Sequence, residues 1–199
     1  HTIAYDTTMF VKASIAEVRE TLFIAVLLVI VTVYVFLQDF RTTLIPALTI
    51  PVSLIGTFAV MAVLGLTINT MTLGGLTVSL GVVVDDAVVG VENIVRRLRS
   101  AGAADRAAII ANATVEVRAP VVYATYLLAF TIAPILFLTG LQGAFFSPLA
   151  LSFLLAVLAS LVVALTVTPA LAVLLLGRMT PHEEPRALAR AKAWHRAQL

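Results

Sequence analysis

Residues 119–177 read APVVYATYLLAFTIAPILFLTGLQGAFFSPLALSFLLAVLASLVVALTVTPALAVLLLG, a run of 59 residues without a charged side chain or a histidine. A helix that crosses ~30 Å of hydrocarbon needs roughly 20 mostly apolar residues. This run is therefore long enough for two membrane spans joined by a turn. Residues 42–84 form a second uncharged run of 43 residues, and residues 21–38 add a third of 18. These three runs predict an integral membrane protein.

The composition of the whole chain agrees with this prediction. Of its 199 residues, 61% are hydrophobic and only 12% are charged, and the mean hydropathy is +1.07. An average soluble domain is about 45–50% apolar and about 25% charged. The difference excludes a soluble enzyme domain, a disordered tail and a nucleic-acid-binding module. The chain contains no cysteine, which excludes a disulfide scaffold and thiolate metal sites.

The expected fold class is an all-α membrane protein. Segments of about ten residues with alternating polarity, the mark of a membrane barrel, are not seen. Turns are expected at residues 65–69 (GLTIN) and 139–143 (TGLQG), where they divide the two long uncharged runs. Five transmembrane helices result, near residues 21–37, 44–64, 71–91, 120–138 and 146–176.

The positions of the basic residues predict how these helices are oriented. Basic residues concentrate in the cytoplasmic loops of membrane proteins. Only Lys12 and Arg19 fall on one side of the predicted spans, which predicts that the N-terminus lies outside the cytoplasm and the C-terminus inside it. The other 11 of the 13 basic residues fall on the opposite side: Arg41, Arg96, Arg97, Arg99, Arg106, Arg118, Arg178, Arg186, Arg190, Lys192 and Arg196.

The segments outside the spans complete the expected organisation. Residues 1–20 form an extracytoplasmic segment leading into the first span, with Asp6, Thr7 and Thr8 as candidate helix caps. Residues 21–176 form the five-helix bundle, and residues 177–199 form a basic amphipathic helix on the cytoplasmic face. The chain begins at His1 rather than Met, so we expect a fragment of a longer polypeptide.

Two adjacent acids, Asp85 and Asp86, interrupt the third span in GVVVDDAVVGVEN, residues 81–93. A charged side chain at the centre of a bilayer costs at least ~2.5–3.5 kcal/mol, so such residues mark functional sites. Helical spacing gathers polar and small residues on one side of the span. One stripe contains Gly74, Val78, Gly81, Asp85 and Glu92, and the stripe beside it contains Thr72, Ser79, Asp86, Gly90 and Asn93. We expect this side to face a helical bundle.

Three uses of the acidic pair are open on these residues alone. The pair can bind and release protons, bind a cation such as Na⁺, or form an ion pair with a basic residue on another helix. A proton or ion relay is favoured, because none of the other predicted spans contains Lys, Arg or His. An intramembrane aspartyl protease is excluded, because adjacent residues on a helix diverge by about 100° and cannot meet at one bond. Metal ligation within the spans is not expected, since His1, His182 and His195 all lie outside them.

Other polar residues and the prolines are weaker candidates. Glu92 and Asn93 lie near the cytoplasmic end of the span, where helix capping or a salt bridge to Arg96 is as good an interpretation as function. The prolines within the spans, Pro46, Pro51, Pro134 and Pro169, are candidate kinks. Four threonines could relay protons through their hydroxyls, although such groups more often bond their own backbone: Thr125, Thr131, Thr166 and Thr168.

The block VVVDDAVVGVEN resembles the fourth transmembrane helix of the resistance-nodulation-division (RND) efflux pumps. The similarity extends over residues 5–176. It includes YDTT at 5–8, FLQDFRTTLIPALTIPVSLIGTF at 36–58, INTMTLGGL at 68–76, EVRAPVVYAT at 116–125, LFLTGLQGAFFSPLA at 136–150 and ASLVVALTVTPAL at 159–171. The resemblance implies that the five spans match helices 2 to 6 of the RND transmembrane domain. It also implies that Asp85 and Asp86 are the proton-relay pair, with Gly81, Glu92 and Asn93 as possible supporting residues.

The same resemblance implies partners and a class of substrate. It implies a proton-driven exporter of the bacterial inner membrane, not an enzyme, with no cofactor. It further implies a C-terminal half that supplies a basic relay partner, a homotrimer, a periplasmic adaptor and an outer-membrane channel. Some blocks are more similar to exporters of copper, silver, cobalt, zinc or cadmium, and others to multidrug exporters. We expect the metal branch; the alternatives are a multidrug exporter, or a protein- or lipid-export relative. A non-transporting membrane scaffold is a third class.

Overall fold

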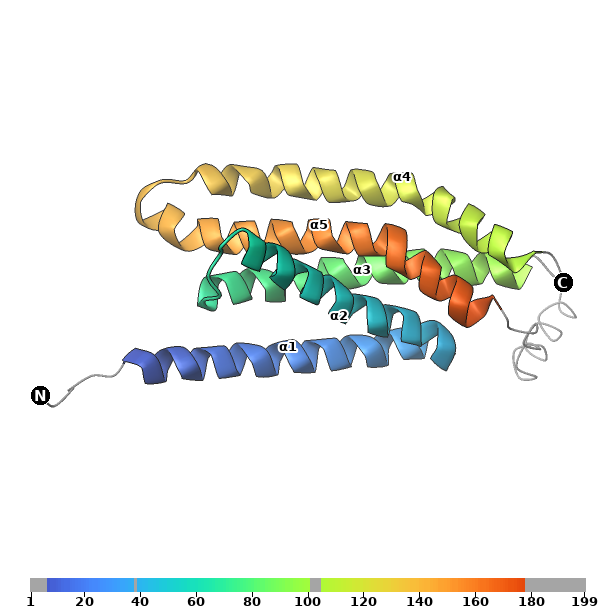
Figure 1. Ribbon diagram of the computed structural model, residues 1–199, viewed down its shortest axis with the longest axis horizontal. Helices are drawn as coiled ribbons and strands as arrows, with labels where there is room; N and C mark the ends of the chain where they lie inside the picture. Colours follow the sequence, from blue (N-terminus) through green and yellow to red (C-terminus); the bar gives the residue numbers. More distant parts are fainter. Residues whose placement is uncertain (1–6, 38, 101–104, 178–199) are drawn as a thin grey trace, which may run out of the picture.

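The computed structural model describes residues 7–37, 39–100 and 105–177. Across these ranges the chain forms long helices and no strand, which confirms the predicted all-α fold. In order, the elements are α1 (Thr7–Leu37), α2 (Phe40–Val63), α3 (Thr70–Ser100), α4 (Arg106–Ile132), the short 3-10 helix η1 (Ala133–Phe137) and α5 (Gly140–Leu176). The helices lie roughly side by side as a bundle (Figure 1).

In the described part of the chain, four helical segments are long and apolar enough to cross a membrane: α2, α3, α4 together with η1, and α5. The first predicted span, residues 21–37, lies in α1, which is one continuous helix from Thr7. Its crossing of the membrane stays a prediction. The expected amphipathic helix at 177–199 falls almost entirely on residues 178–199, outside the described residues, as do Asp6 and the three histidines.

Several predicted boundaries are displaced. α3 continues to Ser100 and α4 begins at Arg106, so both helices run well beyond their apolar stretches. The second turn is shorter than the predicted residues 139–143, because α5 already begins at Gly140. Gly65 and Gly140 mark the two turns, with φ of 68° and 67°. This left-handed conformation favours glycine, which has no Cβ to collide with the backbone.

Local hydrogen bonds explain where two helices begin. At the start of α2, the Asp39 carboxylate accepts bonds from the Arg41 backbone N–H at 3.2 Å and the Thr42 hydroxyl at 2.8 Å. Before α3, Asn69 and Thr72 bond reciprocally: the Thr72 N–H donates to Asn69 Oδ1, and the Asn69 N–H donates to Thr72 Oγ1. These side chains satisfy backbone donors that a helix start leaves without partners.

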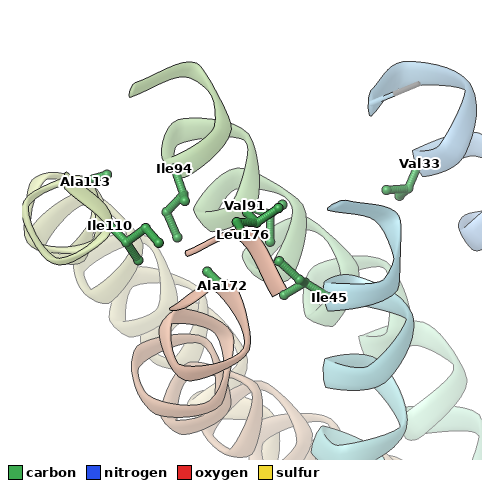
Figure 2. Packing of buried hydrophobic residues seen from close by; sticks show 8 residues of the cluster. All are labelled: Val33, Ile45, Val91, Ile94, Ile110, Ala113, Ala172 and Leu176. Carbon is green, nitrogen blue, oxygen red and sulfur yellow. The ribbon is translucent and has the colours of Figure 1, made fainter. Parts of the chain in front are cut away.

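Helix α5 lies at the centre of the bundle and packs most extensively against α3, then against α2 and α4. At the end where α5 finishes, one apolar cluster takes residues from all five α-helices (Figure 2). Its members are Val33, Ile45, Val91, Ile94, Ile110, Ala113, Ala172 and Leu176. Close packing of this kind drives helix association in lipid, where exclusion of water contributes little. The cluster therefore fixes α3, α4 and α5 relative to one another.

One end of the bundle is rich in arginine, as the sequence predicts. The C-terminal end of α3, the start of α4 and the end of α5 meet there (Figure 1). The Arg106 guanidinium donates to the backbone carbonyl of Leu176 at 3.1 Å, which joins the start of α4 to the end of α5. Arg96, Arg97 and Arg99 lie in the last turns of α3. We call this the arginine-rich end.

Candidate functional site

The two acids occupy different surroundings halfway along α3. Asp86 is half-buried between helices, whereas Asp85 is exposed. Neighbouring residues on a helix point about 100° apart, so a single partner helix cannot cover both. This chain covers the stripe that contains Asp86 and leaves the stripe that contains Asp85 open.

Asp86 has a direct hydrogen-bond partner on α5. The Ser160 hydroxyl donates to Asp86 Oδ2 at 3.1 Å. Ser160 is itself buried, at 2% exposure. Ser160 is not among the residues predicted from sequence, because a lone serine among apolar residues gives no local signal. Buried serine at 152 and 160 and buried threonine at 168 repeat every eight residues along α5, and this spacing is the one sequence feature that could have indicated a polar seam.

Glycines bring α3 close to α5, but not all of the glycines on the acidic side do so. A Cβ at Gly75 would collide with the Leu149 carbonyl and the Ser152 hydroxyl, so α5 touches the α3 backbone there. A Cβ at Gly90 would lie 3.7 Å from the Thr168 methyl group. Gly74 and Gly81 have nothing within 4 Å of an added Cβ. Gly81, a possible supporting residue, is exposed on the open stripe with Asp85.

A small cavity adjoins Asp86 on the side of the arginine-rich end. Its volume is about 20 Å³, and α3, α4 and α5 each contribute to its wall. Arg118 of α4 lines it as well, so a basic residue from just before the fourth predicted span lies on the same cavity as the carboxylate. The two side chains do not form an ion pair: among the described residues the ion pair is Arg97–Glu116, at 2.7 Å.

Asn93 is the centre of a polar network that joins α3 to α4. Its Nδ2 donates to the Ala113 backbone carbonyl at 2.8 Å and to Glu116 Oε2 at 3.3 Å. Its Oδ1 accepts a bond from the Arg96 guanidinium at 2.7 Å. Glu116 in turn accepts two bonds from Arg97. The alternative salt bridge between Glu92 and Arg96 does not form, since Glu92 is exposed and Arg96 bonds Asn93 instead.

The four candidate threonines divide into two kinds. Thr125, Thr131 and Thr166 each donate to the carbonyl four residues earlier, at 2.6–2.9 Å, as hydroxyls in helices commonly do. Thr168 differs, because its buried hydroxyl oxygen has no hydrogen-bond partner within the described part of the chain. It lies on the wall of the cavity beside Asp86.

The described residues offer no ready metal site, because they contain no group of three or more His, Cys, Asp or Glu side chains that could hold a metal ion. Asp85 and Asp86 supply two carboxylates that point in different directions. The arrangement on α3 is therefore suited to holding a single charge or proton at Asp86, between a serine hydroxyl and a small cavity that is lined mostly by apolar residues.

Comparison with known proteins places the chain in a family. Residues 1–197 match the model of the AcrB/AcrD/AcrF family. Similar relatives are the multidrug resistance proteins MdtC of Enterobacter sp., Salmonella schwarzengrund and Pectobacterium atrosepticum, which are 41%, 42% and 40% identical over 184 residues. Those residues are 92% of this chain but 18% of each relative.

The names of these relatives bear on whether the chain is more similar to metal exporters or to multidrug exporters. Their printed name concerns multidrug resistance, so they support the multidrug alternative and lend no support to the metal branch that the sequence analysis favoured. The matched region includes the acidic pair, Ser160 and the cavity beside them. The chain therefore belongs to the AcrB/AcrD/AcrF family, a family of RND efflux transporters.

Proposed function

We propose that this chain is the proton-coupling part of an RND transporter that exports drugs across the bacterial inner membrane. Asp85 and Asp86 are the relay residues in this proposal. The observation that carries it is the half-buried carboxylate of Asp86, which accepts a hydrogen bond from Ser160 beside a small cavity halfway along α3. Intramembrane carboxylates of this kind commonly serve proton relays in pumps.

The uncovered face of α3 supports the proposal that a helix from outside this chain packs against it. Asp85 is exposed there together with Gly81 and Glu92. Leaving an ionised carboxylate against lipid costs ~2.5–3.5 kcal/mol or more, so another helix with a basic residue is expected to cover it. The chain spans 18% of the length of the relatives it matches, and their remaining length can supply such a helix. We assign that role to a basic residue of the C-terminal half.

A cycle of protonation gives this geometry a mechanism. A proton that enters from the periplasm neutralises the acidic pair and removes its attraction for the basic partner. The shift of α3 that follows is transmitted to α5 through the Ser160 contact and through the close approach at Gly75. Release of the proton to the cytoplasm restores the charge. Each elementary charge that crosses the membrane supplies ~2.3 kcal/mol per 100 mV.

The rest of the assembly follows from the family in this proposal. The exported compounds are lipophilic drugs rather than metal ions, because the similar relatives are named for multidrug resistance. A homotrimer, a periplasmic adaptor and an outer-membrane channel complete the export route. Coupling between the relay and a distant drug site is allosteric, since proton and drug bind at separate places.

The proposal is tested in a pump-deficient bacterium that expresses the complete transporter. Accumulation of a lipophilic dye and of Cu, Zn and Co is compared for the wild type, Asp85→Asn and Asp86→Asn. We expect wild type alone to lower dye content, with metal content unchanged. Glu20→Gln, which alters an exposed carboxylate of α1, is the matched control and should export normally. Wild-type dye export by either aspartate variant would overturn the proposal, and lower metal content in wild type would restore the metal branch.

A further inference from the structure

The cavity beside Asp86 is of the right size and chemistry for a water molecule. Its volume of about 20 Å³ exceeds the ~10–15 Å³ that one buried water requires. A buried water also needs two to four polar partners. Asp86 of α3 and Thr168 of α5 both line the cavity and can supply such partners from different helices.

Thr168 supplies a hydroxyl that nothing else in the described chain satisfies. The residue is 1% exposed and its Oγ1 has no hydrogen-bond partner. Buried hydroxyls are nearly always bonded, so an unpaired one calls for a partner such as an ordered water. Five other helical threonines show the contrast, because each donates to the carbonyl four residues earlier: Thr57, Thr114, Thr125, Thr131 and Thr166.

The proline after Thr168 leaves a backbone carbonyl of α5 without its usual hydrogen-bond donor. Pro169 lies inside α5 and has no N–H, so the Leu165 carbonyl loses the donor that a regular helix would provide. Leu165 and Pro169 both line the cavity. The residues that line this space therefore include an acid, a threonine with an unpaired hydroxyl and a leucine whose carbonyl lacks its helical donor, and the space has room for one water molecule.

The cavity extends along α3 toward the arginine-rich end. On α3 its wall runs from Asp86 through Gly90 to Ile94, which is ~12 Å along the helix at 1.5 Å per residue. This direction leads toward the arginine-rich end. Arg118 lines the same cavity and is exposed. A guanidinium keeps contact with water or with polar headgroups. The part of the cavity wall that Arg118 forms therefore connects the cavity to water at the arginine-rich end.

We propose that Thr168 holds a water molecule that carries protons between Asp86 and the arginine-rich end of the bundle. The inference rests on the proposed function of Asp86 as a relay residue. The Asp86 carboxylic acid gives its proton to this water, and the resulting hydronium passes a proton on to the solvent at Arg118, leaving the carboxylate and a neutral water. Thr168 orients the water and gains or loses no proton overall. It is a positioning residue.

The experiment uses the complete transporter, purified and reconstituted in proteoliposomes with an imposed pH gradient. Drug-dependent proton flux is measured for the wild type, Thr168→Val, Thr168→Ser and Thr125→Val. Valine has the shape of threonine without its hydroxyl, so we expect Thr168→Val to slow the flux by about tenfold, the effect of losing one hydrogen bond from the transfer step. Thr168→Ser should restore most of it. Thr125→Val removes an equally buried hydroxyl that bonds only its own helix, and should behave as wild type.

The outcomes separate this inference from the proposed function. Normal flux in Thr168→Val, with Asp86→Asn inactive, overturns the role of Thr168 and leaves the relay standing. Equal slowing in Thr168→Val and Thr168→Ser, or in Thr125→Val, also overturns it, because packing would then explain the effect. Normal flux in Asp86→Asn overturns the proposed function and this inference together. Thermal unfolding of each purified variant is measured alongside, and Thr168→Val should unfold within about 2 °C of wild type, because it loses one hydrogen bond that is worth only about 0.5–1.5 kcal/mol.

Discussion

The Ser160 hydroxyl donates a 3.1 Å hydrogen bond to Asp86 Oδ2, across a separation of 74 residues in the chain. This bond ties the half-buried carboxylate of α3 to the central helix of the bundle. A change in the charge of Asp86 therefore acts directly on the contact between α3 and α5, the most extensive helix pair in the structure. In the proposed mechanism, this bond is the route by which protonation of Asp86 shifts α3 relative to α5.

Removal of the Ser160 hydroxyl is expected to weaken this coupling. Hydrogen bonds to charged groups contribute about 1.5–3 kcal/mol, so Ser160→Ala should lower drug export by ~10- to 100-fold. Ser152→Ala is the matched control, because the buried Ser152 hydroxyl bonds the Leu149 carbonyl of its own helix at 3.0 Å. Export is measured as dye efflux from cells with equal amounts of membrane-inserted protein. Equal export by Ser160→Ala and wild type would mean that the bond has no part in coupling.

The two adjacent glycines at 74 and 75 should respond differently to alanine. A Cβ at Gly75 would collide with the Leu149 backbone carbonyl, which cannot move without shifting α5. Gly75→Ala should therefore destabilise the protein by about 1–3 kcal/mol, the usual cost of overpacking. Gly74→Ala meets nothing within 4 Å and should be neutral. Thermal unfolding of the detergent-solubilised transporter checks this, and equal stability of the two variants would contradict the α3–α5 packing described above.

The Asn93 network is expected to hold the ends of α3 and α4 together. Asn93 is 5% exposed and bonds groups on both helices. Asn93→Leu leaves the buried Ala113 carbonyl without this donor, which should cost about 1–3 kcal/mol. Glu92→Gln alters the exposed neighbour on the same helix and should leave the unfolding temperature unchanged. Thermal unfolding of the purified transporter checks this, and an Asn93→Leu variant as stable as wild type would contradict the role of the network.

The helices could be predicted from sequence because lipid imposes a simple rule of length and polarity. Uncharged runs located α2, α3 and α5, and the turn at Gly65 was anticipated by its GLTIN composition. The same rule could not show that α3 extends to Ser100, since its last turns lie beyond the apolar stretch and are stabilised by contacts with α4. The sequence does not locate the start of α5 at Gly140 either, because TGLQG is as compatible with a turn as with a first helical turn.

The candidate site was only partly predictable, and the reason is long-range packing. Asp85 and Asp86 stand out because charge is rare within a span. Ser160 could not be identified, because its role depends on which face of α5 meets α3. Sequence alone also cannot show that Gly75, rather than Gly74, faces α5, because the two glycines are neighbours that differ only in the direction they point from the helix. Thr168 differs from Thr166 in being buried beside Asp86 with an unpaired hydroxyl, and both differences depend on how α5 packs against its neighbours.

The central claim, that the acidic pair carries protons for drug export, is tested most directly by proton flux through the reconstituted complete transporter. A pH-sensitive dye inside the proteoliposomes reports drug-dependent proton movement in the wild type and in Asp86→Asn, at equal protein content and equal unfolding temperature. The account predicts a drug-dependent flux in the wild type and none above the protein-free leak in Asp86→Asn. An equal flux in the two proteins would contradict it.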